Sequence, residues 1–282
     1  MRGTIALDID GTLTDGEHLP PNVIAYLQSL TDSGWRLVFI TGRTFQSGYK
    51  TLKSLTFPYY LAVQNGAIIL EMPSQRILAK KYLDRSIFKE MAEICKDEPS
   101  DFVVFGGYEN NDHCYYLPEN FSPDLMAYLY RRVESYREIW HPLASYEEIE
   151  LDFFPSIKCF GLYSSAKVLA QRIEDRLGLH VPVIRDPFGT DHYVVQATHP
   201  QISKGQALLD LIDLTGQRGK VIAAGDDYND VPMFAAADVS IVMGTAPKDL
   251  LASADIIAKA ASEEGIIKAL EEAIGHAGNN RL

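Results

Sequence analysis

The chain has 282 residues, of which 46% are hydrophobic and 23% charged, a composition typical of a globular protein long enough for two domains. Its net charge of −12 argues against nucleic acids and anionic membranes as partners, because both would repel an acidic surface. We recognise no signal-peptide pattern, and no apolar run approaches about 18 residues, so we expect a soluble, cytoplasmic protein without a membrane partner. The sequence does not indicate an oligomeric state.

The first part of the sequence predicts strands that alternate with helices. Apolar runs at 4–7, 35–40 and 59–63 are separated by amphipathic stretches that predict helices from Pro21 to about Gly34 and over 45–55. Asn65-Gly66 then leads into a further apolar run, which predicts a hairpin. Because these runs are apolar throughout, we expect a β-α-β-α-β order in a parallel sheet that is buried on both faces.

The pattern changes near residue 84. Helical stretches at 87–95, 123–137 and 165–177 are interleaved with short runs that are often aromatic and alternate in polarity. Such runs are typical of an antiparallel sheet with one covered face. We therefore predict an inserted α+β domain over residues 84–190, with strand-like runs at 102–105, 114–117, 149–154, 157–163 and 181–185, and a further such run follows at 192–195.

The C-terminal part returns to the first pattern. A helix is expected over 203–214, strands over 220–224, 239–243 and 255–258, and a closing helix from about 263. The predicted fold class is therefore α/β. Residues 1–83 and 191–282 would form a doubly wound core with a parallel sheet, interrupted by the inserted domain.

The first apolar run ends in two carboxylates, Asp8 and Asp10. In a strand, residues i and i+2 face the same side, so the two charges would repel unless they share a metal ion or a proton. Gly11 and the hydroxyl residues that follow suit a tight loop whose backbone N–H groups can bind an anion. Carboxylates, a cation and an anion site together indicate phosphate chemistry.

The ends of the other predicted core strands also carry polar residues. Parallel α/β sheets bind ligands beyond the carboxyl ends of their strands, so these residues should meet at one edge. The residues expected there are Asp8, Asp10, Thr41, Asn65, Asp226 and Asp230.

The residue types suggest a division of roles. One of the two leading carboxylates would attack phosphorus and the other would transfer protons. Asp226 and Asp230 would complete the shell of a Mg²⁺ ion. Thr41 and Lys204 would bind phosphoryl oxygens.

Four segments, taken together, resemble the motifs of the haloacid dehalogenase superfamily in its phosphatase branch. The Asn65-Gly66-Ala67 turn and the long insertion are similar to those of its Cof-type members, which have a large α/β cap. The four segments are Asp8-Ile9-Asp10-Gly11-Thr12-Leu13, Thr41-Gly42-Arg43, Ser203-Lys204-Gly205 and Gly225-Asp226-Asp227-Tyr228-Asn229-Asp230.

The resemblance implies specific roles for the matching residues. Asp8 would be the nucleophile and Asp10 the general acid and base. Mg²⁺ would be held by the Asp8 carboxylate, the Asp10 backbone carbonyl and Asp226, with Asp230 in support. Thr41 and Lys204 match the positions that bind the phosphate. Gly42, Arg43, Asn65 and Asn229 would lie near the substrate.

The expected activity is that of a Mg²⁺-dependent phosphoric monoester hydrolase. It would act on a small phosphorylated metabolite, with sugar phosphates as the first candidates, through an aspartyl-phosphate. The inserted domain would be the cap that closes over the site and excludes water. Thr245 and Val195-Gln196 depart from the pattern of many relatives, which concerns the substrate more than the chemistry.

Two alternatives remain open at this point. A phosphomutase of the same superfamily would return the phosphoryl group to the substrate. A regulator that binds a phosphometabolite without turnover would need no nucleophile.

Overall fold

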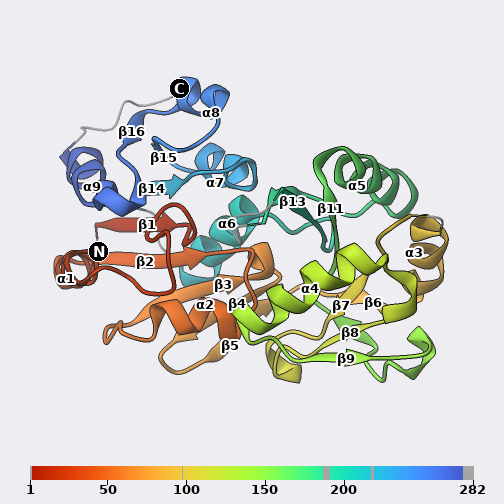
Figure 1. The fold of residues 1–282 in the computed structure, drawn as a ribbon. Coiled ribbons are helices and arrows are strands. Elements are labelled where there is room, and N and C mark those ends of the chain that lie inside the picture. The colour runs from red at the N-terminus through yellow and green to blue at the C-terminus, as the bar shows by residue number, and fades with distance from the viewer. Residues whose placement is uncertain (1, 97, 187–190, 217–218, 276–282) are drawn as a thin grey trace. The chain divides into compact units, whose positions relative to one another are not determined.

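The computed structural model describes residues 2–96, 98–186, 191–216 and 219–275, and the chain folds as two compact units (Figure 1). Unit 1 comprises Met1–Arg43, Ser47–Lys80 and Ser203–Leu282. Unit 2 comprises Lys81–Ile202 and the short segment Thr44–Gln46. Each unit has its own sheet and is described separately.

Unit 1 contains one eight-stranded sheet. Its strands are β1 Gly3–Leu7, β2 Trp35–Ile40, β3 Tyr59–Val63, β4 Ile68–Met72, β5 Arg76–Lys80, β14 Lys220–Gly225, β15 Val239–Met243 and β16 Ile256–Ala258. Their order is β16-β15-β14-β1-β2-β3-β4-β5. All neighbours from β16 to β3 are parallel, and β4 and β5 extend the sheet as antiparallel strands. The predicted α/β class with a parallel sheet is confirmed.

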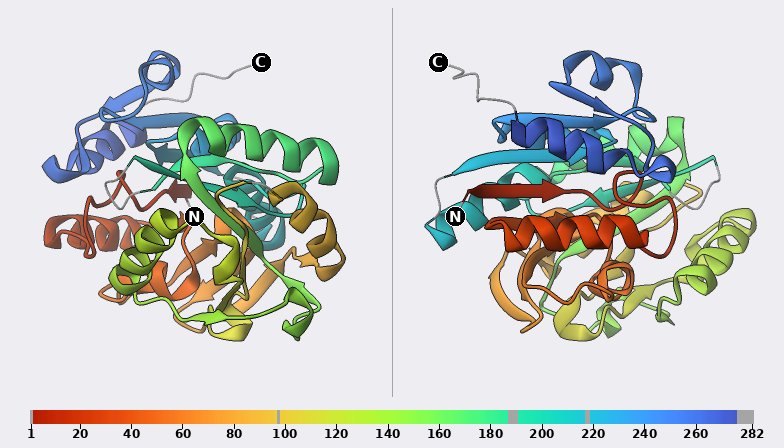
Figure 2. Two further views of the ribbon diagram at one scale, coloured as in Figure 1. Left: turned by 45° about the vertical axis from the view of Figure 1, so that its right-hand side comes forward. Right: turned by 90° about the vertical axis from the view of Figure 1, so that its left-hand side faces the viewer.

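Helices on both sides make the sheet of unit 1 doubly wound. The helices that accompany its strands in the chain are α1 Pro21–Asp32, α2 Phe45–Leu52, α6 Lys204–Thr215, α7 Val231–Ala235, α8 Lys248–Ser253 and α9 Gly265–Gly275. On one face Leu208 and Leu211 of α6 and Met233 of α7 pack with Val38 and Ala62 of the sheet. α1 and α9 contact each other and the strands on the opposite face, as the right-hand view of Figure 2 shows.

Strand β1 lies at the centre of the sheet and sets the position of the loops. Leu7, its last residue, pairs with Ala224 of β14 on one side and with Phe39 of β2 on the other. Every residue of β1 is buried. Because the three strands are parallel and in register, the segments that follow them begin at the same edge of the sheet.

The predicted hairpin after Val63 is confirmed. β3 and β4 pair as antiparallel strands, with Val63 opposite Ile68. A 3₁₀ turn over Gln64–Gly66 connects them, and Asn65 adopts a left-handed conformation with φ of 57°. Strand β5 was not predicted, because its residues lie at the edge of the sheet and form no continuous buried run.

Unit 2 contains a six-stranded and a two-stranded sheet. The larger sheet consists of β7 Val103–Phe105, β8 Cys114–Tyr116, β9 Trp140–Pro142, β11 Ser156–Leu162, β12 Val183–Arg185 and β13 His192–Ala197. Their order is β12-β13-β11-β7-β8-β9, and all pairs except β8 with β9 are antiparallel. The smaller sheet pairs β6 Leu83–Asp84 with β10 Phe153–Phe154.

The prediction that only one face of this sheet is covered was wrong. Helices α3 Phe88–Cys95 and α5 Tyr163–Leu177 contribute to a core on one face. A third helix, α4 Pro123–Tyr136, contributes Leu125, Tyr128 and Leu129 to a second core, which includes Phe105 and Phe160 of the sheet. The aromatic residues on this face explain the difference, since they need a cover that the strand pattern alone did not reveal.

The limits of the inserted unit differ from the prediction. β13 pairs along its length with β11, so residues up to Ile202 belong to unit 2, whereas the core was expected to resume at 191. The predicted boundary residue 190 lies outside the described residues. The strand expected over 149–154 is present only at its end, as β10, and follows a 3₁₀ turn over Tyr146–Glu148.

Among the described helices, none has both the length and the apolar character that a membrane crossing requires.

The packing of α6 gives a test of unit 1. Leu208 is fully buried against the sheet, whereas the next residue, Leu209, is 43% exposed. We expect Leu208→Ala to lower the free energy of unfolding by about 2–5 kcal/mol, because it leaves a cavity in the core. Leu209→Ala makes the same change of residue type and should lower it by less than about 1 kcal/mol. Urea denaturation followed by circular dichroism measures both, and equal losses would contradict the described packing.

Candidate active site

Asp8 and Lys204 form an ion pair at the end of the central strand. The Asp8 N–H donates to the Ala224 carbonyl at 3.0 Å, which continues the register of β1 and fixes the backbone of Asp8. The Lys204 Nζ lies 2.7 Å from Asp8 Oδ1. Asp8 is 5% and Lys204 1% exposed, so the pair is almost fully removed from solvent.

The position of Lys204 results from the start of helix α6. The Ser203 hydroxyl caps the helix by accepting the N–H of Gln206 at 3.0 Å, and Lys204 is the first helical residue. Burial alone would lower the pKa of Lys204, but the carboxylates of Asp230 and Asp8 outweigh it and raise that pKa. The lysine is therefore a permanent cation in the site.

Asp230 organises the loop that follows β14. Its Oδ1 accepts from the Lys204 Nζ at 2.6 Å, and its Oδ2 accepts the N–H groups of Asp226 at 3.0 Å and Asp227 at 3.1 Å. Asp230 is fully buried, and both of its oxygens are engaged. A Cβ on Gly225 would lie 2.3 Å from the Asp230 Cγ, so only glycine allows the strand to approach this carboxylate.

Asp226 brings a third carboxylate to the same place. Asp8, Asp226 and Asp230 each offer an oxygen, and these atoms all lie within 4.8 Å of one another. Gly11 has φ of 69°, and a Cβ there would lie 2.2 Å from Asp226 Oδ2. The loop after β1 therefore needs glycine both for its conformation and for its contact with Asp226.

The electrostatics of the three carboxylates favour a bound cation. Burial raises the pKa of Asp8 to about 7, against the opposing effect of Lys204. Burial, and then the charges of Asp8 and Asp230, raise the pKa of Asp226 to about 9. Crowded, buried carboxylate oxygens of this kind suit a hard divalent cation, which would favour their ionised forms.

Asp10 lies outside this group of three. The guanidinium of Arg43 binds both of its oxygens: Nε donates to Oδ2 at 2.8 Å and Nη2 pairs with Oδ1. Arg43 also donates from Nη1 to the Thr51 hydroxyl at 2.8 Å. Arg43 was expected near the substrate, and the structure places it on Asp10, a pair that no sequence pattern indicated.

The loop after Asp8 contains polar groups without partners. Within the described residues, the backbone N–H groups of Ile9, Asp10 and Thr12 make no hydrogen bond. The N–H groups of Gly11 and Thr14 are used inside the loop, bonding to Thr14 and Ile9 respectively. The Thr12 hydroxyl is buried and also has no partner among the described residues. These unpaired donors agree with the anion-binding loop that the glycine and hydroxyl residues predict.

Thr41 connects the second motif with the hairpin. It is buried at the end of β2; its hydroxyl accepts the N–H of Arg43 at 3.1 Å and its carbonyl accepts the N–H of Asn65 at 2.8 Å. The Asn229 side chain donates to Asn65 Oδ1 at 3.3 Å. Thr41, Asn65 and Asn229 are thus joined by a chain of contacts, and Gly42 lies between Thr41 and Arg43.

All of the predicted site residues belong to unit 1. Those that the structure joins directly are Asp8, Lys204, Asp230 and Asp226 in one group, Asp10 with Arg43 in a second, and Thr41, Asn65 and Asn229 in a third.

Comparisons with known proteins agree with this geometry. The sequence family described as haloacid dehalogenase-like hydrolase matches residues 5–270. Phosphoglycolate phosphatase of Nitrosopumilus maritimus is 23% identical over 95% of this chain and 95% of its own. Pyridoxal phosphate phosphatase YbhA of Escherichia coli is 22% identical over 90% of this chain and 92% of its own.

The fold has close counterparts among solved structures. A haloacid dehalogenase-like hydrolase from B. subtilis covers 95% of this chain and 98% of its own, with a TM-score of 0.78 and 21% identity. The predicted enzyme class, a phosphoric monoester hydrolase, is confirmed by the family and by the names of the relatives. Because the family match extends over nearly the whole sequence, the chain belongs to the haloacid dehalogenase-like hydrolases.

Proposed function

We propose that the chain is a Mg²⁺-dependent phosphatase that hydrolyses a small phosphorylated metabolite through an aspartyl-phosphate on Asp8. The observation that carries this proposal is the buried Asp8 carboxylate. It lies beside Lys204 and two further carboxylates and is followed by a loop with unpaired N–H groups. A regulator that only binds a phosphometabolite would need no such nucleophile.

The donor set supports Mg²⁺ as the cation. Asp8 and Asp226 would hold it with the Asp10 backbone carbonyl, and Asp230 would support the loop that carries Asp226. When bound, the ion would offset the negative charge of the carboxylates and of the substrate phosphate. In this assignment Asp10 would contribute its backbone carbonyl to the ion, so its carboxylate would not have to lie with those of Asp8, Asp226 and Asp230.

Asp8 would attack the phosphorus atom. Lys204 holds one of its oxygens at 2.7 Å, which leaves the other oxygen as the attacking atom. The unpaired N–H groups of Ile9 and Asp10 and the hydroxyl of Thr41 would donate to the phosphoryl oxygens. These donors lie on short loops anchored by the sheet, so the transition state would meet fixed partners.

Asp10 would protonate the leaving oxygen and later accept a proton from the attacking water. In the present arrangement Arg43 occupies both oxygens of Asp10. Proton transfer would therefore require one of these oxygens to exchange the guanidinium for the leaving group. Arg43 would act as a positioning residue, while Gly42, Asn65 and Asn229 would line the substrate side.

The substrate would be a small phosphorylated metabolite, with sugar phosphates as the first candidates. The relatives named above indicate how varied such substrates are, since one is a phosphoglycolate phosphatase and another a pyridoxal phosphate phosphatase. Unit 2, inserted between Lys80 and Ser203, would act as the cap that selects among them.

The proposal is tested first by phosphate release from a panel of substrates. The panel should contain sugar phosphates, phosphoglycolate, pyridoxal phosphate and nucleoside monophosphates, each with and without Mg²⁺. Release with Mg²⁺ from at least one member is expected. Release that needs a sugar bisphosphate and returns the phosphoryl group to the sugar would indicate a mutase instead.

Removing the nucleophile should abolish turnover. We expect Asp8→Asn to lower kcat by about 10³-fold or more, because the amide is a poor nucleophile of nearly the same shape. Asp227→Asn is a matched control, since Asp227 lies in the same loop as Asp226 and its side chain accepts the backbone N–H of Tyr228 at 2.7 Å. Its kcat should stay within about fivefold of the parent. Substantial turnover by Asp8→Asn, measured as phosphate release, would refute the assignment of the nucleophile.

The metal assignment gives a separate test. A chelator should silence the enzyme, and added Mg²⁺ should restore it. Asp226→Asn should raise the Mg²⁺ concentration for half-maximal activity by about tenfold or more, whereas Asp227→Asn should not change it. Undiminished activity in chelator, or equal Mg²⁺ requirements of the two variants, would contradict the proposed site.

The role of Arg43 is tested by separating kcat from KM. Lysine cannot reproduce the two-point contact with Asp10, so Arg43→Lys should lower kcat by about 10–100-fold with a smaller change in KM. Arg76→Lys, an exposed site in the same unit, is the control and should leave both constants unchanged. A rise in KM at constant kcat would show that Arg43 binds the substrate instead of positioning Asp10.

A further inference from the structure

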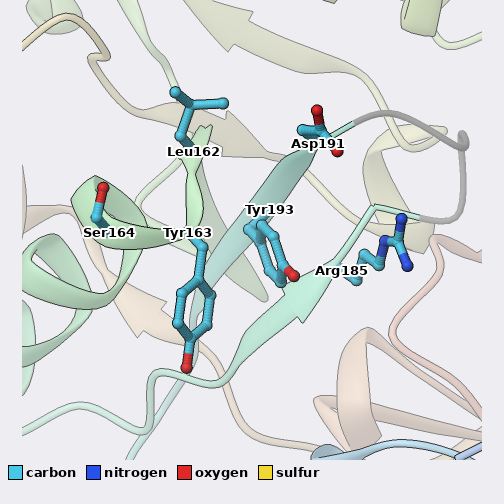
Figure 3. A pocket seen from close by; sticks show the side chains of 6 residues that line it. All are labelled: Leu162, Tyr163, Ser164, Arg185, Asp191 and Tyr193. Carbon is cyan, nitrogen blue, oxygen red and sulfur yellow. The ribbon is translucent and has the colours of Figure 1, made fainter.

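Unit 2 contains a pocket of about 430 Å³ beside the beginning of helix α5 (Figure 3). It is lined by Leu162, Tyr163, Ser164, Arg185, Asp191 and Tyr193. Leu162, Tyr163 and Ser164 belong to the junction of β11 and α5, and the other three come from β12, β13 and the residue before β13. The volume lies in the range of sites for small ligands, and no lining residue takes part in the proposed phosphatase chemistry.

Two tyrosines form the apolar part of the pocket. The rings of Tyr163 and Tyr193 are 5.0 Å apart between centroids and are inclined at 55°, and Figure 3 shows them side by side. Tyr163 is 54% exposed although it begins a helix, and the adjacent Leu162 is 56% exposed. An exposed aromatic pair next to an apolar side chain favours a ligand with a ring or another apolar group.

Two opposite charges line the pocket beside Tyr193. Arg185 pairs directly with Tyr193 across the β12–β13 ladder, and Asp191 lies immediately before β13; both side chains line the pocket with Tyr193. Within the described residues, neither side chain makes a hydrogen bond or an ion pair. The pocket thus presents a cation and an anion that do not neutralise each other.

We propose that this pocket binds a free α-amino acid with an aromatic side chain. Its carboxylate would pair with Arg185 and its ammonium group with Asp191, because the ligand carries one charge of each sign and each is opposite to one of these two side chains. Its ring would cover Tyr163 and Tyr193. A nucleotide fits less well, since its phosphate adds negative charge near Asp191 without an ammonium group to pair with it.

A titration of the full chain with L-phenylalanine, followed by saturation-transfer NMR, tests the proposal directly and does not depend on phosphatase activity. A dissociation constant of about 0.1–1 mM is expected for a small ligand in an open pocket. N-acetyl-L-phenylalanine lacks the ammonium group and L-phenylalaninamide lacks the carboxylate. The affinity of each should therefore be lower than that of L-phenylalanine by about tenfold or more. AMP should not compete with L-phenylalanine.

Variants locate the site. Arg185→Gln and Asp191→Asn should each weaken the binding of L-phenylalanine by about tenfold or more, and both replace exposed side chains, so the fold should persist in circular dichroism. Arg131→Gln, an exposed position on α4 outside the pocket, should leave binding unchanged. No binding at about 10 mM, equal binding of the blocked analogues, competition by AMP, or unchanged affinity of both pocket variants would overturn the proposal.

Discussion

The burial of a lysine ammonium between two carboxylates is the constraint on which the proposed active site of this hydrolase depends. Lys204 contacts Asp8 and Asp230, and Asp230 in turn holds the backbone of the loop that carries Asp226. A buried charge that loses its partner costs several kcal/mol, so removing Lys204 would leave both carboxylates uncompensated. The network therefore ties the first, third and fourth motifs together before any substrate is present.

The parallel sheet makes this network possible. Residues 8, 204 and 230 are far apart in the sequence. In the fold, β1 and β14 are neighbouring strands, and helices α6 and α7 pack together on one face of these two strands. The ends of these elements therefore deliver their side chains to one point with little freedom. Such preorganised groups can stabilise charge in a transition state without first being ordered.

The sequence was sufficient to predict the central sheet and most of the acidic group, because buried strands leave long apolar runs and their ends carry the polar residues. It did not predict the contact between Arg43 and Asp10, since the direction of a long side chain leaves no periodic signal. The edge strands β5 and β9 were missed because they are short and partly exposed. The cover that α4 provides was missed because alternation along a strand shows which residues are polar but not what packs on them.

The backbone lies very close to a carboxylate at both Gly11 and Gly225. This limits which single-nucleotide substitutions the gene can accept at these two codons. Neither glycine carries a functional group, yet a Cβ at either position would overlap an aspartate of the site. Every single-nucleotide change that alters either residue adds at least a methyl group or ends the chain. In a library of random variants scored for activity, both positions should therefore be as depleted as Asp8, the proposed nucleophile, whereas Gly34 and Gly178, whose Cβ positions meet no atom within 4 Å, should be depleted less.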